Sequence, residues 1–118
     1  MSMPLARRLT VLNRYGMYAR PAALIVKIVQ LKGPHTAVTI TKDNDTIKGT
    51  SIMGLLTLEA TQGVELLVVA QGPEAREVLE ELTHLFNVGF YSDEAQLAVP
   101  PAHSEFIELK DEDVPIPD

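Results

Sequence analysis

The stretch that decides the fold is residues 13–33, with the sequence NRYGMYARPAALIVKIVQLKG. Gly16 favours a turn, and Pro21 suits the first turn of a helix because its missing N–H group would have no intrahelical partner there. Residues 22–31 are almost entirely apolar, and Lys32-Gly33-Pro34 is a typical helix ending. The stretch therefore predicts a turn followed by a helix that buries one face.

Strands are predicted on both sides of this helix, where apolar and polar side chains alternate or form short apolar runs. The predicted strands are residues 6–12, 37–42, 46–48 and 64–70, a short helix begins at Ser51, and a last amphipathic helix follows Gly72-Pro73. The order is βαββαβα. It predicts an α+β open-faced sandwich, in which a four-stranded, mostly antiparallel sheet carries its helices on one face.

The negative charge of the chain is concentrated near its C-terminal end. The 118 residues have a net charge of −6. Residues 1–92 contain nine basic and eight acidic side chains, whereas residues 93–118 contain eight acidic side chains and only Lys110 as a basic one. The first part has no net positive field to release counterions, so nucleic-acid binding by general basicity is not expected.

This division of charge also indicates the domain organisation. We predict one domain over residues 1–91 and an acidic, proline-containing tail over residues 92–118. The composition of the tail is typical of an extended or disordered segment. The alternative is that Phe106, Ile107 and Leu109 dock the tail onto the domain.

Composition excludes several kinds of site. The chain has no cysteine, which excludes a disulfide framework, a thiolate metal site and a cysteine nucleophile. Its first residues lack the apolar run of a signal peptide, and no stretch approaches about 18 consecutive apolar residues. We expect a soluble, cytoplasmic protein that binds no membrane, and no metal or organic cofactor because no cluster of ligand side chains is present.

The first candidate site is the strand-to-helix junction at residues 13–22. A helix N-terminus presents backbone N–H groups and the positive end of a dipole, which suits an anion. Arg20 lies in the first predicted turn, where its guanidinium group is placed to bind a phosphate. The alternative is that Gly16 makes the turn, Pro21 begins the helix and Arg20 is simply solvated.

The second candidate site is residues 49–57, GTSIMGLLT. Ser51 at a helix start is most simply an N-cap, whose hydroxyl accepts from a backbone N–H two or three residues on. The same position tolerates a phosphoserine, because phosphate at a helix start is electrostatically favoured. Ile52, Met53 and Leu56 include core residues, and Met53 is also suited to an exposed, adaptable contact.

Together the two segments resemble the HPr family, the histidine-containing phosphocarrier proteins of the bacterial phosphotransferase system. The pattern N-x-x-G-[apolar]-x-A-R-P-A is followed about 30 residues later by S-I-M-G-L-L, and the resemblance covers roughly residues 5–90. It implies that a histidine in the first motif takes phosphate from Enzyme I and passes it to sugar-specific components, with the following arginine as partner. It also implies that the serine of the second motif is a substrate of an ATP-dependent HPr kinase/phosphorylase.

The sequence departs from the family at the position of that histidine, which here is Tyr18. A reversible relay needs a nitrogen nucleophile, and imidazole is available in its neutral form near neutral pH. A phenol, with a reference pKa of about 10, is mostly protonated there, and its phosphate ester would be a poor donor. We therefore predict no catalytic residue and a non-enzymatic protein. The other histidines, His35, His84 and His103, are interpreted as surface or packing residues.

Ser51, in contrast, lies in an intact motif, and this combination resembles in its logic the catabolite-repression branch of the family, which also lacks the histidine. The leading hypothesis is a regulatory protein that is switched by phosphorylation of Ser51. Arg20 and Ala19 would be the anion-binding positions left from the ancestral site. The predicted docking face consists of Met17, Ile52, Met53 and Leu56, and the implied partners are an HPr kinase/phosphorylase-like enzyme and a transcriptional regulator or phosphotransferase proteins such as Enzyme I.

Other hypotheses stay open. The chain could be a phosphocarrier of the sugar phosphotransferase system that lost its histidine at Tyr18, or a scaffold that works through its acidic tail. The tail could also fold back and occupy the anion site near Arg20. Short loops and an apolar first helix make strand exchange, and hence a homodimer, conceivable.

Overall fold

The computed structural model describes residues 3–92, 98 and 105–117. Its elements, in chain order, are β1 (Leu5–Thr10), α1 (Ala19–Lys32), β2 (Ala37–Lys42), β3 (Asp45–Lys48), α2 (Ile52–Thr57), β4 (Glu65–Gln71), α3 (Ala75–Asn87), the 3-10 turn η1 (Gly89–Tyr91), β5 (Ile107–Glu108) and the 3-10 turn η3 (Asp111–Asp113). The predicted order βαββαβα is confirmed up to α3. The chain then adds one more strand.

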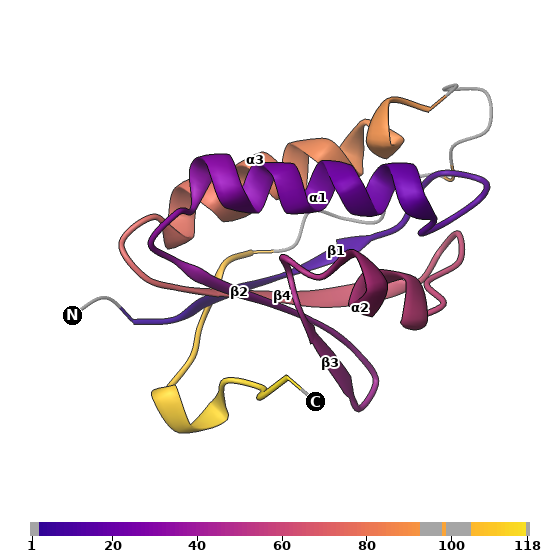
Figure 1. Ribbon diagram of the computed structural model, residues 1–118. Coiled ribbons are helices and arrows are strands. Elements are labelled where there is room, and N and C mark those ends of the chain that lie inside the picture. The colour runs from indigo at the N-terminus through magenta and orange to yellow at the C-terminus, as the bar shows by residue number, and fades with distance from the viewer. Residues whose placement is uncertain (1–2, 93–97, 99–104, 118) are drawn as a thin grey trace.

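The sheet has the strand order β3-β2-β4-β1-β5 within the described residues. All of its neighbouring strands pair antiparallel. β4 lies in the middle, between β2 and β1, and the helices cover one face (Figure 1). The α+β sandwich with helices on one face is therefore confirmed, with five strands in place of the predicted four.

The core lies between the sheet and the helices. Val38 and Ile40 of β2 point into it, as their alternation predicts, together with Leu66 and Val68 of β4. The amphipathic helix α3 packs on the sheet with its apolar face. Its Phe86 packs against Phe90, with 4.8 Å between the ring centroids. The apolar residues that recur every second position in the strands face those that recur at helical spacing in α1 and α3. Because each set buries the other, sheet and helices form one core.

Helix α1 begins two residues before Pro21. Tyr18 is its N-cap, with an extended backbone (φ −129°, ψ −170°), and its carbonyl accepts from the Ala22 N–H at 3.0 Å. Pro21 thus lies in the first turn, as predicted, and needs no hydrogen-bond partner there. The helix ends at Gly33, whose N–H donates to the carbonyl of Val29.

The C-terminal segment, which we define as residues 105–117, differs from the expectation drawn from its composition. Ile107 and Glu108 form β5, which pairs with Leu5 and Ala6 of β1, and η3 follows. The docking alternative is thus the one that these residues follow. Average composition predicts disorder here because it counts the charges and prolines, whereas a few apolar residues suffice to attach the segment to an open strand edge.

Candidate functional site

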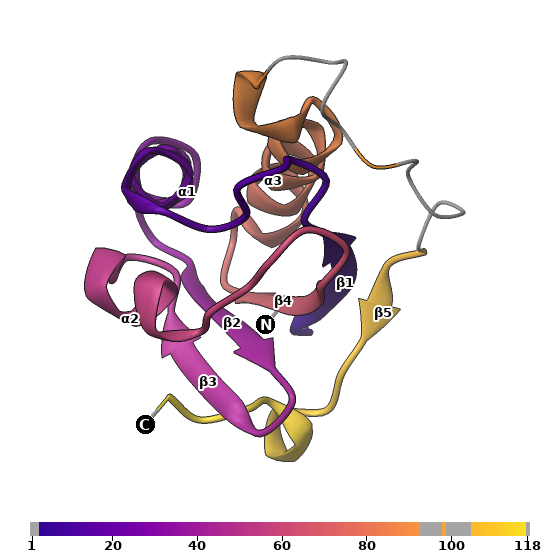
Figure 2. The ribbon, with the colours of Figure 1, turned by 90° about the vertical axis from the view of Figure 1, so that its right-hand side faces the viewer.

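The two segments singled out by the sequence lie at the same end of the molecule. α1 begins at this end, α2 packs beside it, and α3 and η1 end there (Figures 1 and 2). The opposite end holds the last turn of α1 and the first turn of α3. Tertiary structure thus brings together two motifs that are about 30 residues apart in the sequence.

The turn before α1 is held by the backbone of the loop that follows α2. Gly16 has a φ of +68°, and a Cβ atom there would lie 2.5 Å from the carbonyl oxygen of Ala60. Met17 donates its N–H to the same carbonyl at 2.8 Å, while the Asn13 side-chain amide donates to the carbonyl of Gly16 at 2.9 Å. Only glycine fits this position. The hydrogen bond from Met17 to Ala60 then places the following residue, Tyr18, at the start of α1.

Tyr18 and Arg20 contact each other directly. The Arg20 Nη2 and Nε groups donate to the Tyr18 hydroxyl at 2.9 and 3.2 Å. These are adjacent N–H groups of the guanidinium fork, the arrangement that binds two oxygens of a phosphate or carboxylate. The phenol oxygen therefore occupies the donors that the predicted anion site requires. Ala19, the other predicted anion-binding position, is exposed at the first residue of α1.

The other hydrogen bonds of Arg20 go to η1, the turn after α3, and to Ser92, which follows it. Nη1 donates to the carbonyl of Phe90 at 2.5 Å, and Nη2 also reaches the Ser92 hydroxyl at 3.2 Å. Phe90 and Tyr91 both have positive φ, at 56° and 61°, so this turn is strained for residues with side chains. Arg20 thus ties the start of α1 to a turn 70 residues away, a contact for which the sequence carries no signal.

Ser51 is the N-cap of α2, as predicted. Its backbone is extended, and its hydroxyl accepts from the Gly54 N–H at 2.9 Å. The residue is half-buried and lines a hollow of about 440 Å³, the Ser51 hollow, together with Lys48, Gly54 and Pro117. The hydroxyl is therefore held in one place, at the edge of an accessible space.

The predicted docking residues divide into exposed and buried ones. Met53 is 71% exposed and Ile52 is also exposed, whereas Leu56 is half-buried against the core. Met17 is only 8% exposed and belongs to the core, so its prediction as a docking contact is not supported. Met17 follows the turn at residues 13–16, and the hydrogen bond from its N–H to the carbonyl of Ala60 holds it beneath the surface. The exposed aromatic rings of Tyr15 and Tyr18 lie at the same end, and the sequence did not indicate Tyr15 as part of this surface.

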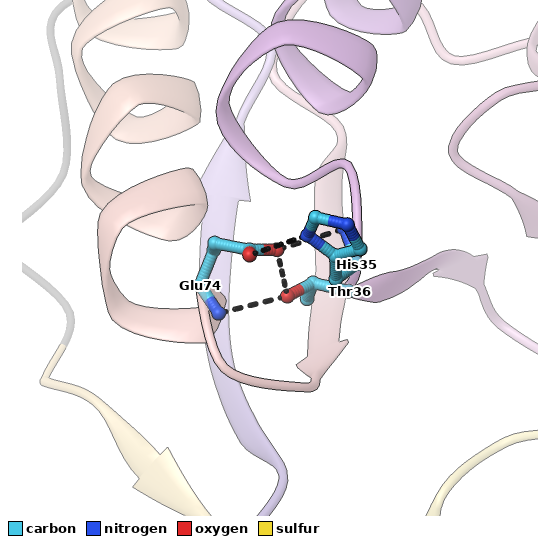
Figure 3. Close-up of polar contacts among 3 residues, drawn as sticks. All are labelled: His35, Thr36 and Glu74. Atoms are coloured by element: carbon cyan, nitrogen blue, oxygen red, sulfur yellow. Dashed lines mark hydrogen bonds and ion pairs between the residues drawn. The ribbon is translucent and has the colours of Figure 1, made fainter.

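His35 lies at the other end of the molecule, in the loop between α1 and β2, as expected. Its backbone N–H donates to the Glu74 carboxylate at 2.9 Å, and the Thr36 hydroxyl donates to it at 2.8 Å (Figure 3). Glu74 returns a hydrogen bond from its own N–H to the Thr36 oxygen at 2.9 Å. His84 is exposed on α3, and His103 lies outside the described residues.

Glu74 has a perturbed pKa. Burial raises the pKa of its carboxyl, but hydrogen bonds from Thr36 and His35 and the nearby imidazole outweigh burial and lower it below its ordinary value. The cluster joins the loop after α1 to the first turn of α3. We interpret it as a structural contact, because the Thr36 hydroxyl is fully engaged within it.

Two further observations concern what the site contains. The described residues include no group of three or more histidine, cysteine or acidic side chains able to hold a metal ion, and none of their helices is long and apolar enough to cross a membrane.

The idea that the tail reaches Arg20 finds no support from Asp111, which accepts from Gln71 at 3.1 Å, at the far end of β4. The acidic residues Asp93 and Glu94 lie outside the described residues.

Comparison with known sequences identifies relatives. The family model described as "PTS HPr component phosphorylation site" matches residues 5–87. The phosphocarrier protein HPr of Chlamydia trachomatis is 36% identical over 81 residues, 69% of this chain and 72% of that protein. The phosphocarrier protein NPr of Escherichia coli K12 is 33% identical over 92 residues, 77% of this chain and all of that protein. The multiphosphoryl transfer protein of Haemophilus influenzae is 29% identical over 92% of this chain, which spans only 21% of that protein.

Solved structures show the same likeness. The HPr-C-His protein of Thermoanaerobacter tengcongensis has a TM-score of 0.69 and 28% identity, and covers 75% of this chain and 97% of its own. Crh, the catabolite-repression protein of Bacillus subtilis, was solved as a domain-swapped, intertwined dimer. It has a TM-score of 0.57 and 34% identity over 64% of this chain and 85% of its own.

Proposed function

Because the chain belongs to the HPr family of the phosphotransferase system, we propose that it is a regulatory member switched by phosphorylation of Ser51. Members of this family are phosphocarriers rather than classical enzymes, and the chain is phosphocarrier-like in sequence and fold. The observation that carries the regulatory proposal is the contact between Tyr18 and Arg20. In this contact the Tyr18 phenol oxygen takes up the Arg20 N–H groups that would otherwise bind a phosphate at the start of α1.

The chemistry of the phenol argues against a relay at Tyr18. A carrier must accept a phosphoryl group and give it up again, which a phosphorylated imidazole nitrogen does readily and a tyrosine ester does not. Near neutral pH a phenol of ordinary pKa, about 10, is protonated and therefore a weak nucleophile. The Tyr18 oxygen also accepts two hydrogen bonds from Arg20, which leaves its lone pairs engaged. A phosphoryl group would have to displace both.

Ser51 is the better acceptor for a regulatory phosphate. An ester is the appropriate product where a modification has to persist until a phosphatase removes it. The hydroxyl lies at the edge of the Ser51 hollow, next to the exposed side chains of Ile52 and Met53. A phosphate there would add about −1.5 to −2 charges beside an apolar contact surface, and thereby change which proteins bind it.

The proposed partners follow from this surface. An HPr kinase/phosphorylase-like enzyme would modify Ser51, and a transcriptional regulator or a phosphotransferase protein such as Enzyme I would dock on Ile52 and Met53. The exposed rings of Tyr15 and Tyr18 extend the same end of the molecule and would add contact area. We place these events in the cytoplasm, and we regard a homodimer of the kind described for Crh as a further possible state.

The test is phosphorylation of the full chain by an HPr kinase with ATP, followed by mass spectrometry. We expect one phosphate on Ser51 in the wild-type protein and in the Thr50→Ala variant, which removes the neighbouring exposed hydroxyl as a matched control. The Ser51→Ala variant should remain unmodified. Absence of phosphate from the wild-type chain, or equal labelling of Ser51→Ala, would refute the proposal.

A second candidate function is that of a carrier that has lost its histidine. It is favoured by the phosphocarrier relatives and by Arg20 and Pro21, which keep the family pattern. The Tyr18→His variant, incubated with Enzyme I and phosphoenolpyruvate, separates the two. Transfer of phosphate from this variant to a downstream component would support the carrier. If the variant stays unlabelled, the surface that Enzyme I recognises has diverged.

A further inference from the structure

The C-terminal segment, residues 105–117, wraps around the edge of the sheet and continues along the face that the helices leave uncovered (Figures 1 and 2). It is anchored at its start. The Phe106 ring lies between two guanidinium groups, 4.4 Å from Arg7 and 4.6 Å from Arg76. Beyond β5, the Leu109 N–H donates to the carbonyl of Pro4 at 2.9 Å.

The segment covers a face that an open-faced sandwich would expose. Ala6, Val69 and Thr39 pair across β1, β4 and β2, one position out of phase with the residues that face the helices. They therefore point away from the helices. Even so, Ala6 is fully buried, Val69 is 1% exposed and Thr39 is 9% exposed. The residues that lie over this face in the structure are those of the C-terminal segment.

The packing between the segment and the sheet is loose beyond its anchor. A hollow of about 670 Å³, the sheet hollow, lies between Thr39 and Val69 on one side and Val114 and Pro115 on the other. Among the described residues the Thr39 hydroxyl finds no hydrogen-bond partner. A contact that leaves such space forfeits dispersion attraction and opens more readily than a packed core. Beyond its anchor the segment is therefore held less tightly than the core.

The end of the segment lies at the candidate regulatory site. Pro117 lines both the sheet hollow and the Ser51 hollow, and so does Lys48. Asp111 and Glu112 line the sheet hollow on the side of the segment. Lys48 lines both hollows and is thus a cation that both the acidic residues of the segment and a phosphate on Ser51 would attract.

We infer that phosphorylation of Ser51 releases the C-terminal segment from the sheet, an inference that rests on the function proposed above. A phosphate brings about −1.5 to −2 charges into the Ser51 hollow. It draws Lys48 toward itself and away from Asp111 and Glu112, and it takes up space next to Pro117. Each effect disfavours the docked segment. Release uncovers the face around Val69 and Thr39 as a second contact surface.

Thermodynamic linkage makes the coupling reciprocal. If a phosphate on Ser51 weakens docking of the segment by a given factor, docking must oppose the phosphorylated state by the same factor. The phosphorylated state of Ser51 and the docked state of the segment then disfavour each other by the same free energy. The coupling can be measured from either side.

The test uses the full chain with phosphoserine inserted at position 51 during synthesis, so that no kinase is required. Amide hydrogen exchange is followed by NMR at Leu109, which reports on docking, and at Val68, which lies in the helix-covered sheet. Phosphoserine should accelerate exchange at Leu109 by about tenfold, a coupling of ordinary size, and leave Val68 unchanged. Equal exchange at Leu109 in both forms, or an equal rise at Val68, would overturn the inference.

Lys48 provides the matched control. Lys48→Gln should accelerate Leu109 exchange in the unmodified chain and remove most of the difference made by phosphoserine. Lys27→Gln, which removes the same charge from the exposed side of α1, should leave that difference intact. If Lys48→Gln keeps the full difference, competition for Lys48 is refuted.

A third experiment asks whether the docked segment obstructs phosphorylation of Ser51. Phe106→Ala should detach the segment and accelerate phosphorylation of Ser51 by an HPr kinase several-fold, whereas Ile116→Ala, at a position that is 83% exposed, should not. Equal rates in the two variants would show that the docked segment does not obstruct Ser51. If the kinase labels no variant at all, the proposed function fails, while the exchange result with phosphoserine still decides whether the segment responds to the phosphate.

Discussion

The two faces of the sheet are covered in different ways. On one face, Ile40 and Val68 pack against α1 and α3 in a continuous core that contains the large rings of Phe86 and Phe90. On the other, the C-terminal segment spans a hollow of about 670 Å³. Its anchor, Phe106, lies outside this hollow, at the β1 edge of the sheet, against Arg7 and Arg76. The family model matches residues 5–87, which include the helix-covered face, whereas the C-terminal segment lies beyond that match. A close-packed face supplies stability, and a loosely covered one supplies a contact that can open.

The largest effect is expected from Phe86→Ala on the helix-covered face. The Phe86 side chain is 1% exposed and packs against Phe90. Its truncation should lower the free energy of unfolding by about 3–5 kcal/mol, because the cavity cannot collapse in a close-packed core. Urea unfolding of the full chain measures this. A loss below about 1 kcal/mol would show that the core is not packed as described.

The same substitution at the start of the C-terminal segment, Phe106→Ala, should cost less. Phe106 is half-buried and contacts the guanidinium groups of Arg7 and Arg76, so we expect a loss of about 1–3 kcal/mol. The loss should be confined to docking of the segment, with fast amide exchange at Leu109 and unchanged exchange at Val68. If Phe106→Ala destabilises the protein as much as Phe86→Ala, the C-terminal segment is not a separate, more weakly held element.

The smallest effect is expected from Glu74→Gln and should depend on pH. The pKa of Glu74 is lowered in the folded protein, so its hydrogen bonds stabilise the fold above its unfolded pKa and are lost as the pH falls through the folded pKa. Glu74→Gln should lower the thermal unfolding midpoint near neutral pH, with the difference shrinking below about pH 4.

The control for this prediction is Glu80→Gln, which neutralises an exposed carboxylate in the middle of α3. It should change the midpoint little at either pH. A difference between Glu74→Gln and wild type that grows toward acid pH would contradict the assigned direction of the pKa.

Much of the fold was predictable because local periodicity carries it. The alternation in residues 37–42 and the helical spacing in residues 75–87 each match one element of the structure. Arg20 and Pro21 were predicted in the first turn of α1, where they lie, whereas Tyr18 is an N-cap with no side-chain hydrogen bond and carries no sequence signal for that role. Ser51 was predicted as an N-cap from its residue type and position alone, and the structure confirms that geometry.

The parts that could not be predicted depend on contacts between distant residues. Arg20 donates to Phe90 and Ser92, which lie 70 and 72 residues further along the chain. Met17 looked like a surface residue because nothing local shows that its N–H must reach Ala60. Such contacts depend on where other elements are placed, and no local pattern encodes that.

By itself, the sequence determined the order of the elements, the glycine turn before α1, the tyrosine in place of the family histidine and the serine cap of α2. Each of these depends on a residue and its near neighbours, whose backbone preferences and chemistry act locally. Only the tertiary structure decided that Arg20 is engaged by Tyr18 and Phe90, that the acidic C-terminal segment covers the open face, and that Pro117 lies beside Ser51. These follow from the burial of apolar surface and the pairing of polar groups across the whole chain, which become defined only when the complete fold forms.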